Sequence, residues 1–205
     1  MSPPTPRLIL ASASPRRSAL LQQIGVAHRI VPSRIEERRI EGESVEQCVL
    51  RLARQKAQQV QAQLSAEPSA RALPVLGADT AVVIDDLMLG KPRDRDEALA
   101  MLLRLSAREH EVLSAVALTR PDAPPGACES MLSRSSVRLR ALERVECELY
   151  WDSGEPRDKA GAYAIQGFGA IFIESLRGSY SGVMGLPLFE TAALLTAAGV
   201  PLWQA

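Results

Sequence analysis

A single aspartate interrupts the most apolar stretch of this sequence. Apart from Asp79 and Thr80, residues 73–84 are apolar residues, glycine and proline, which predicts a strand covered on both faces. A carboxylate in such a strand is costly unless it is paired, hydrogen-bonded or bound to a metal ion. We therefore expect Asp79 to take a proton or to hold a cation, and a core aspartate with satisfied hydrogen bonds is the alternative.

The segment Ser12–Arg17 combines groups that bind phosphate. It follows the apolar run Leu8–Ala11, which predicts a buried strand, and it leads into a helix with Ser14 as the N-cap. Free N–H groups at a helix N-terminus attract anions, and the guanidinium groups of Arg16 and Arg17 add forked donors. An ordinary strand-to-helix turn with two exposed arginines would carry the same signals.

Two glutamates and two lysines extend this set. Glu36 and Glu37 follow a predicted strand, where adjacent carboxylates could hold a divalent cation or could simply be solvated. Lys91 lies between a glycine and a proline, so its side chain starts from a short, rigid connection. Lys56 lies near the apolar side of a long helix that Ser44 caps, and a snorkelling surface lysine is its simpler interpretation.

The segment Arg157–Gly167 mixes charges, glycines, a tyrosine and an amide, which is typical of a binding loop. Within it, Asp158 and Lys159 could be a simple surface pair. Gln166 could be a buried, hydrogen-bonded glutamine. Alternatively, its amide, with one acceptor and two donors, could read the imide edge of a pyrimidine.

Alternating strands and helices must position these residues, which places the chain in the α/β class with a mixed sheet. The expected strands are 8–11, 27–31, 73–84, 87–89, 111–118, 131–142 and 170–173. The expected helices are 15–24, 44–60, 94–105, 143–151 and 188–198, and a second glycine-rich loop is expected at 178–187. His110 has no partner histidine nearby and is expected to be structural.

Composition excludes several classes of protein. The 205 residues fit one domain, or one core divided into two lobes, with residues 1–6 as a loose leader that lacks the apolar core of a signal peptide. The chain has 24 basic and 24 acidic residues and no apolar run near the roughly 18 residues of a membrane span. Neither a nucleic-acid polymer nor a membrane is therefore an expected partner. The scattered Cys48, Cys128 and Cys147 predict a reduced, cytoplasmic protein.

Known sequence signatures narrow the chemistry further. The chain has no GxxxxGK[ST] phosphate loop, no complete dinucleotide fingerprint and no GxSxG elbow. Two histidines and scattered cysteines do not form a typical zinc site. What remains is a set of cationic side chains for phosphate, carboxylates for a hard cation and one buried acid. This set suits metal-assisted attack of water on a phosphorus ester.

Taken in order, these segments resemble the Maf family of nucleoside triphosphate pyrophosphatases, over nearly the whole chain. Each motif is weak alone, and the ordered set is specific. The motifs are Ser12-Ala13-Ser14-Pro15-Arg16-Arg17, Ile35-Glu36-Glu37, Arg51-Leu52-Ala53 with Lys56-Ala57, Leu76-Gly77-Ala78-Asp79-Thr80, Gly90-Lys91-Pro92, Asp158-Lys159-Ala160-Gly161-Ala162-Tyr163, Ile165-Gln166-Gly167 and Gly185-Leu186-Pro187. The sequence around Lys159 and Gln166 is similar to that of the branch of the family that acts on dTTP and UTP.

The resemblance implies a mixed, elongated central sheet whose helices form two lobes around a cleft, in a protein that is often a homodimer. It implies hydrolysis of dTTP and UTP to the monophosphate and pyrophosphate, with Mg²⁺ or Mn²⁺ as the cofactor. Modified pyrimidine triphosphates would be further substrates of such a house-cleaning enzyme. Members of the family are also linked to arrest of cell division.

The same resemblance assigns a role to each candidate by its motif. Asp79 is assigned as the proton acceptor that activates water. The alternatives are that Asp79 is a metal ligand instead of the base, or that it has both roles. The metal ligands are Glu37, Glu36 and Asp79. The residues tied to catalysis, phosphate binding or substrate choice are Lys56, Lys91, Ser12, Arg16, Arg17, Thr80, Lys159 and Gln166.

Two other functions would use the same residues. A nucleotide-binding regulator of septum formation would bind nucleotide with little catalysis. A nucleotidyltransferase would form a polymer or a conjugate rather than a free monophosphate. A pure sensor has no need of a base such as Asp79, so the sequence favours the enzyme.

Overall fold

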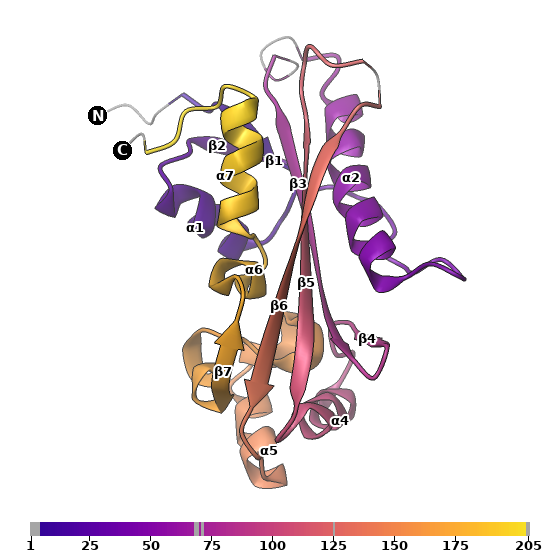
Figure 1. Ribbon diagram of the computed structural model, residues 1–205, viewed down its shortest axis with the longest axis vertical. Helices are drawn as coiled ribbons and strands as arrows, with labels where there is room; N and C mark the ends of the chain where they lie inside the picture. The colour runs from indigo at the N-terminus through magenta and orange to yellow at the C-terminus, as the bar shows by residue number, and fades with distance from the viewer. Residues whose placement is uncertain (1–4, 68–69, 71, 125, 204–205) are drawn as a thin grey trace.

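The computed structural model describes residues 5–67, 70, 72–124 and 126–203, so the first four residues of the expected leader lie outside the described residues. Within this part, a seven-stranded mixed sheet has the order β2-β1-β3-β5-β6-β7, with β4 paired to β3 (Figure 1). Its strands are β1 (Leu8–Leu10), β2 (His28–Ile30), β3 (Val75–Ile84), β4 (Leu87–Leu89), β5 (Glu109–Thr119), β6 (Glu129–Leu139) and β7 (Ile173–Arg177).

Helices flank this sheet (Figure 1). The α-helices are α1 (Pro15–Gln23), α2 (Val45–Gln63), α4 (Arg95–Leu105), α5 (Arg144–Asp152), α6 (Tyr180–Met184) and α7 (Leu188–Ala197). The 3₁₀ helices are η1 (Glu155–Asp158), η2 (Ala160–Ala162) and η3 (Gly167–Phe172). Among the described residues, no helix combines the length and the apolar character that crossing a membrane requires.

Three long antiparallel strands, β3, β5 and β6, run along the length of the molecule (Figure 1). At one end, β1 and β2 extend the sheet in parallel, and α1, α2 and α7 lie around them. We call this end the first lobe. At the other end, the second lobe, β4 and β7 pair with the far ends of β3 and β6, next to α4 and α5. The predicted α/β class, with an elongated sheet and two lobes, is confirmed.

Each lobe has its own apolar cluster packed on the shared strands. Leu8, Leu21 and Leu195 are fully buried in the first lobe, and Leu102 and Leu139 are fully buried in the second. Because both clusters pack against the same long strands, the sheet fixes the position of one lobe relative to the other.

The close packing of α2 on β3 depends on Gly77. A Cβ atom at Gly77 would lie 2.2 Å from the carbonyl oxygen of Ala53 and 2.8 Å from the backbone nitrogen of Ala57. Both contacts are with the helix backbone, so α2 could not keep its place against a larger residue. Lys56 lies on α2 and Asp79 on β3, and the glycine therefore helps to set their separation.

Local sequence signals predict many of the element boundaries. Ser44 and Gln47 form a capping box at the start of α2, and the side chain of Asp94 caps α4. Asp85 and Asp86, with φ of 52° and 58°, form the tight turn that joins β3 to β4. These elements begin where the sequence predicted them.

The strand predicted at residues 170–173 is wrong. Most of this segment belongs to the 3₁₀ helix η3, and β7 begins only at Ile173. The buried residues of η3 are Gly169 and Phe172, which are three positions apart, as in one turn of a 3₁₀ helix. A short apolar run fits either element, so its composition could not distinguish them.

Further differences concern the segment 178–187 and several ends of elements. The segment 178–187, expected as a loop, contains α6, because the side chain of Ser179 accepts a hydrogen bond from the N–H of Gly182 and caps a short helix. The strand expected to end at residue 142 ends at Leu139, beside an irregularity in its pairing with β7.

Candidate active site

One pocket gathers nearly every residue that the sequence analysis singled out. It holds about 330 Å³ and lies where the two lobes meet. The predicted site residues that line it are Ser12, Arg16, Arg17, Glu37, Lys56, Asp79, Thr80, Lys91, Lys159 and Gln166. The pocket is therefore a cleft to which both lobes contribute.

A buried ion pair lies in this pocket. The ammonium group of Lys56 donates to Oδ1 of Asp79 over 2.7 Å, and it also lies 2.9 Å from Oε1 of Glu37. The side chains of Lys56 and Asp79 are only 5% and 7% exposed, whereas that of Glu37 is 51% exposed. The interpretation of Lys56 as a snorkelling surface lysine is therefore wrong, because its side of the helix faces two carboxylates.

Burial and neighbouring cations act in opposite directions on these two carboxylates. Burial raises the pKa of Asp79 above its usual range, and the attraction of Lys56 and Arg17 does not offset it. The carboxylate of Asp79 is therefore a stronger base than that of an ordinary aspartate. Burial also acts to raise the pKa of Glu37, but Lys56, Lys91 and Arg17 outweigh it and the pKa is lowered.

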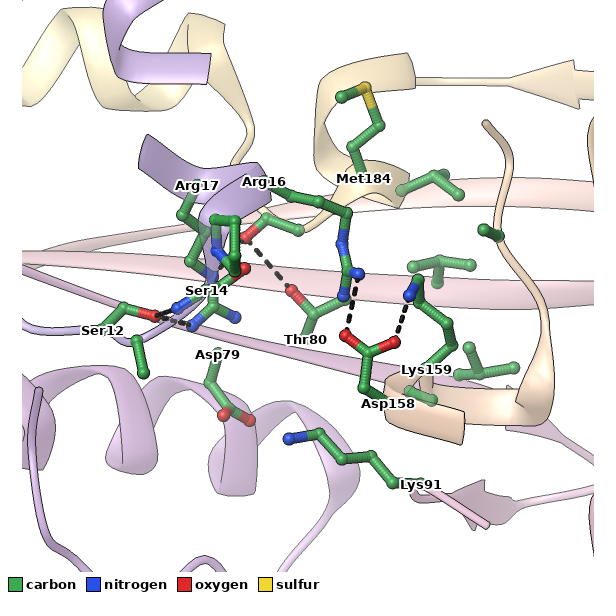
Figure 2. Close-up of a pocket in the computed structure, with 18 of the residues that line it drawn as sticks. Ser12, Ser14, Arg16, Arg17, Asp79, Thr80, Lys91, Asp158, Lys159 and Met184 are labelled. Carbon is green, nitrogen blue, oxygen red and sulfur yellow. Dashed lines mark hydrogen bonds and ion pairs between the residues drawn. The ribbon is translucent and has the colours of Figure 1, made fainter. Parts of the chain in front are cut away.

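Arg17 is held in the pocket by uncharged acceptors. Its Nε donates to the carbonyl oxygen of Gly185 over 2.8 Å, and its NH1 donates to Oγ of Ser12 over 3.2 Å (Figure 2). A guanidinium group has five N–H donors, so these two bonds fix the side chain and leave donors for an anion. Ser14 is the N-cap of α1, as predicted, but its side chain makes no capping hydrogen bond, and its backbone N–H donates to Oγ of Ser12.

Arg16 bridges the two lobes at the pocket. Its NH1 lies 3.2 Å from Oδ2 of Asp158, and Asp158 also contacts the ammonium group of Lys159 (Figure 2). From the sequence, Lys159 was the only side-chain partner predicted for Asp158. Arg16 and Asp158 are 142 positions apart, so no local signal could have paired them.

A buried hydroxyl group lies behind Thr80. The Oγ1 atom of Thr80 lies 3.0 Å from Oγ of Ser114, which is directly opposite it on β5 and only 1% exposed. Thr80 also reaches the carbonyl oxygen of Gly185 over 3.4 Å, the same oxygen that binds Arg17. Ser114 was not among the predicted site residues, although a polar residue within an apolar strand is the signal that singled out Asp79.

The second lobe contributes an amide and a further lysine. Gln166 is exposed and lines the pocket, and Lys159 lines it as well. The ammonium group of Lys159 donates to the backbone carbonyl of Glu155 over 3.1 Å. The cleft therefore combines cationic groups of the first lobe with an amide and two lysines, Lys159 and Lys91, of the second, since Lys91 lies just after β4.

The structure does not bring Glu36 to this site. Its side chain is 73% exposed, lies 3.5 Å from the guanidinium group of Arg38 and does not line the pocket. Glu36 and Glu37 are neighbours in a segment without helix or strand, and Glu37 contacts the buried Lys56 whereas Glu36 contacts the exposed Arg38. The geometry therefore leaves Glu37 and Asp79 as the carboxylates of the predicted metal site.

Two carboxylates fit a cation that binds together with its substrate. No group of three or more His, Cys, Asp or Glu side chains that could hold a metal ion occurs in the part of the chain that the structure describes. Glu37 and Asp79 nevertheless lie close together, because an oxygen of each contacts the same ammonium group. Mg²⁺ is usually bound through one or two carboxylates plus substrate phosphates and waters. The pair fits such a site and does not fit a cage made by the protein alone.

Comparisons with known proteins agree with the motifs. Residues 7–198 match the family model described as Maf-like protein. A dTTP/UTP pyrophosphatase of Bordetella parapertussis is 51% identical over 199 residues, covering 95% of this chain and 94% of that protein. A dTTP/UTP pyrophosphatase of Methylobacillus flagellatus is 52% identical over 196 residues, covering 96% and 94%.

Similarity to solved structures is weaker. The crystal structure of a nucleoside-triphosphatase, a dITP/XTP pyrophosphatase, from Mycobacterium abscessus aligns with a TM-score of 0.43 and 20% identity, over 94% of this chain and 95% of that one. That similarity is too low to bear on the fold or the site. The chain belongs to the Maf-like protein family, because the family model matches residues 7–198 and two relatives are 51% and 52% identical over nearly the whole chain.

Proposed function

We propose that this protein is a nucleoside triphosphate diphosphatase that hydrolyses dTTP and UTP to the monophosphate and pyrophosphate. The observation that carries the proposal is that a buried carboxylate, Asp79, shares one pocket with Arg16, Arg17 and Lys91 (Figure 2). The names of relatives that are 51% and 52% identical support the choice of substrate.

Asp79 accepts a proton from the water molecule that attacks the α-phosphorus. The bond from that phosphorus to the bridging oxygen breaks, and pyrophosphate leaves. Its raised pKa suits Asp79 to this task, because a stronger base takes the proton more readily. Arg16, Arg17 and Lys91 neutralise the charge that develops on the phosphate oxygens, which is the main requirement of phosphoryl transfer. Lys56 orients the carboxylate.

We further propose that Glu37 and Asp79 bind Mg²⁺ or Mn²⁺. Such a cation, when bound, supplies charge stabilisation to the phosphate oxygens. Glu37 is prepared for this role because its pKa is lowered, so the carboxylate is ionised at neutral pH. Lys56 contacts both carboxylates and keeps them close together.

Gln166 reads the base in this proposal. The imide edge of thymine or uracil has one N–H donor between two carbonyl acceptors, and a primary amide offers the complementary acceptor and donors. Thr80 and Arg16 contribute to substrate choice from the opposite lobe, since both line the same pocket.

A substrate panel tests the proposal. The purified protein is incubated with dTTP, UTP, modified pyrimidine triphosphates, dCTP and purine triphosphates, with and without Mg²⁺ or Mn²⁺, and the products are separated by ion-exchange chromatography. We expect monophosphate and pyrophosphate from dTTP and UTP only when a metal ion is present. Tight binding without turnover would favour the regulator of septum formation, and conjugated products would favour the nucleotidyltransferase.

We also propose that the protein acts in the cytoplasm as a homodimer. The three cysteines form no disulfide, which suits a reducing compartment. Val145 and Leu149 are 62% and 67% exposed and lie one turn apart on α5, where apolar side chains favour contact with another subunit. Light scattering at several protein concentrations measures the mass in solution, and a monomer at all concentrations would contradict the dimer.

A further inference from the structure

Two side chains of the second lobe hold both ends of one short loop. The hydroxyl group of Tyr150 accepts a hydrogen bond from the backbone N–H of Ala164 over 3.1 Å, and it donates to Oε1 of Glu155 over 2.8 Å. The carboxylate of Glu155 accepts hydrogen bonds from the N–H groups of Phe168, over 2.9 Å, and Gly169, over 3.0 Å. We call this pair of side chains the Tyr150–Glu155 clamp.

The middle of the clamped loop is the part that faces the pocket. Ile165 and Gln166 lie between the two fixed points, and both line the pocket. Phe168, one of the residues that the clamp binds through its backbone, has a side chain that is 68% exposed. The clamp therefore contacts only the backbone of the loop and leaves the side chain of Gln166 available to a ligand.

The fit between clamp and loop has no spare space. A Cβ atom at Gly167, where φ is +68°, would lie 2.1 Å from Oε2 of Glu155. A Cβ atom at Gly169 would lie 2.6 Å from the hydroxyl group of Tyr150. Glycines at these positions allow the loop to approach both side chains closely, so the loop cannot shift without losing hydrogen bonds.

The charge states of the clamp agree with its hydrogen bonds. Burial acts to raise the pKa of Glu155, but the N–H groups of Gly169 and Phe168 and the hydroxyl of Tyr150 outweigh it, and the pKa is lowered. Burial and the neighbouring Glu155 raise the pKa of Tyr150. An ionised acceptor and a neutral donor are therefore the stable pair at neutral pH.

We propose that Glu155 is a positioning residue that, together with Tyr150, directs Gln166 at the base of the bound nucleotide. The inference rests on the proposed function, because base reading by Gln166 is part of that function. Glu155 acts through the loop backbone and lines no part of the pocket. Its loss should therefore weaken binding and base choice much more than the chemical step at Asp79.

Glu155→Gln tests this role because it keeps the shape of the side chain and replaces one acceptor oxygen by a donor. One loop N–H group then loses its partner. We expect the KM for dTTP and UTP to rise about tenfold and kcat to stay within about threefold, on the scale of one lost hydrogen bond to a charged group. We also expect the preference for dTTP over dCTP to fall. Glu148→Gln, on α5 and paired with Arg144 and Arg95 away from the pocket, is the matched control and should leave these values unchanged.

A double variant separates positioning from general damage. In a Gln166→Ala background, Glu155→Gln should have little further effect on the dTTP-to-dCTP preference, because the amide it directs is absent. An equal loss of preference in both backgrounds, or an unchanged KM and preference in the single variant, would overturn the proposal. Tyr150→Phe, which removes only one hydroxyl group, provides the same comparison if Glu155→Gln fails to fold.

Hydrogen exchange tests the clamp without relying on turnover. Amides of residues 164–169 should exchange faster in Glu155→Gln and Tyr150→Phe than in the wild type, and not in Glu148→Gln. If the wild type hydrolyses no pyrimidine triphosphate while exchange changes as expected, the proposed function fails and the clamp stands. If the wild type is active and exchange is unchanged, the clamp fails and the function stands.

Discussion

Asp79→Asn removes the proposed proton acceptor and nearly preserves the shape of the side chain. An amide cannot take a proton from water, so we expect turnover on dTTP to fall by roughly two to four orders of magnitude, the usual scale for a lost general base. Steady-state kinetics give the turnover, and circular dichroism and thermal melting check the fold. Wild-type turnover in a folded Asp79→Asn protein would exclude this residue as the base.

The carboxylate of Asp79 is almost completely buried, and its ion pair with the equally buried Lys56 offsets the cost of that burial. Lys56→Met keeps a similar volume but leaves Asp79 without its nearest charge, and we expect the free energy of unfolding to fall by about 3–5 kcal/mol. Urea denaturation in the presence of a chelator measures the loss. The same substitution in an Asp79→Asn background should cost much less, and an equal cost in both backgrounds would show that the pairing is not the cause.

The packing of α2 on β3 sets the distance between these two residues. Gly77→Ala would place a Cβ atom against the backbone of α2, so the helix must move, and we expect a loss of about 1–3 kcal/mol in the free energy of unfolding together with reduced turnover. Gly90→Ala is the control for stability, since a Cβ atom there would meet nothing within 4 Å. A stable, fully active Gly77→Ala protein would contradict this role of the glycine.

The elements that carry the site could be predicted because each has a local signal. An apolar run interrupted by Asp79 predicts β3, and helical spacing after Ser44 predicts α2. Tertiary pairing has no such signal. Whether Lys56 faces Asp79 depends on how α2 is rotated over the sheet, and the contact of Glu155 with a distant loop depends on how that loop folds back. Residues 170–173 were misassigned because four apolar residues fit a strand and a 3₁₀ helix equally well.

His110 links the stability of the whole molecule to pH. It is 3% exposed, and its Nε2 lies 2.7 Å from the hydroxyl group of Tyr163. Burial lowers its pKa from 6.5 to about 4, so the unfolded chain takes up a proton at a higher pH than the folded chain does. The contribution of the neutral His110 to the free energy of unfolding is therefore complete above pH 6.5 and is lost as the pH drops toward 4. The loss between pH 7 and pH 5 should be about 2 kcal/mol, at about 1.4 kcal/mol per pH unit.

Urea unfolding at pH 7 and pH 5 measures this loss, and His110→Gln should remove most of the difference. Glu43 and Glu146, whose pKa values are lowered from 4.5 to about 2 by Arg51 and Arg140, affect stability only at lower pH. Asp79, whose raised pKa acts on stability in the opposite direction, is present in both proteins, so the difference between wild type and His110→Gln isolates the histidine. An equally large pH effect in His110→Gln would assign it to another group.

Hydrolysis of dTTP in ¹⁸O-labelled water with Mg²⁺ tests the proposed chemistry most directly. Attack of water on the α-phosphorus, with Asp79 as the base, predicts one labelled oxygen in dTMP and unlabelled pyrophosphate, measured by mass spectrometry of both products. Label in the pyrophosphate, or dTDP and inorganic phosphate as the products, would contradict attack at that phosphorus.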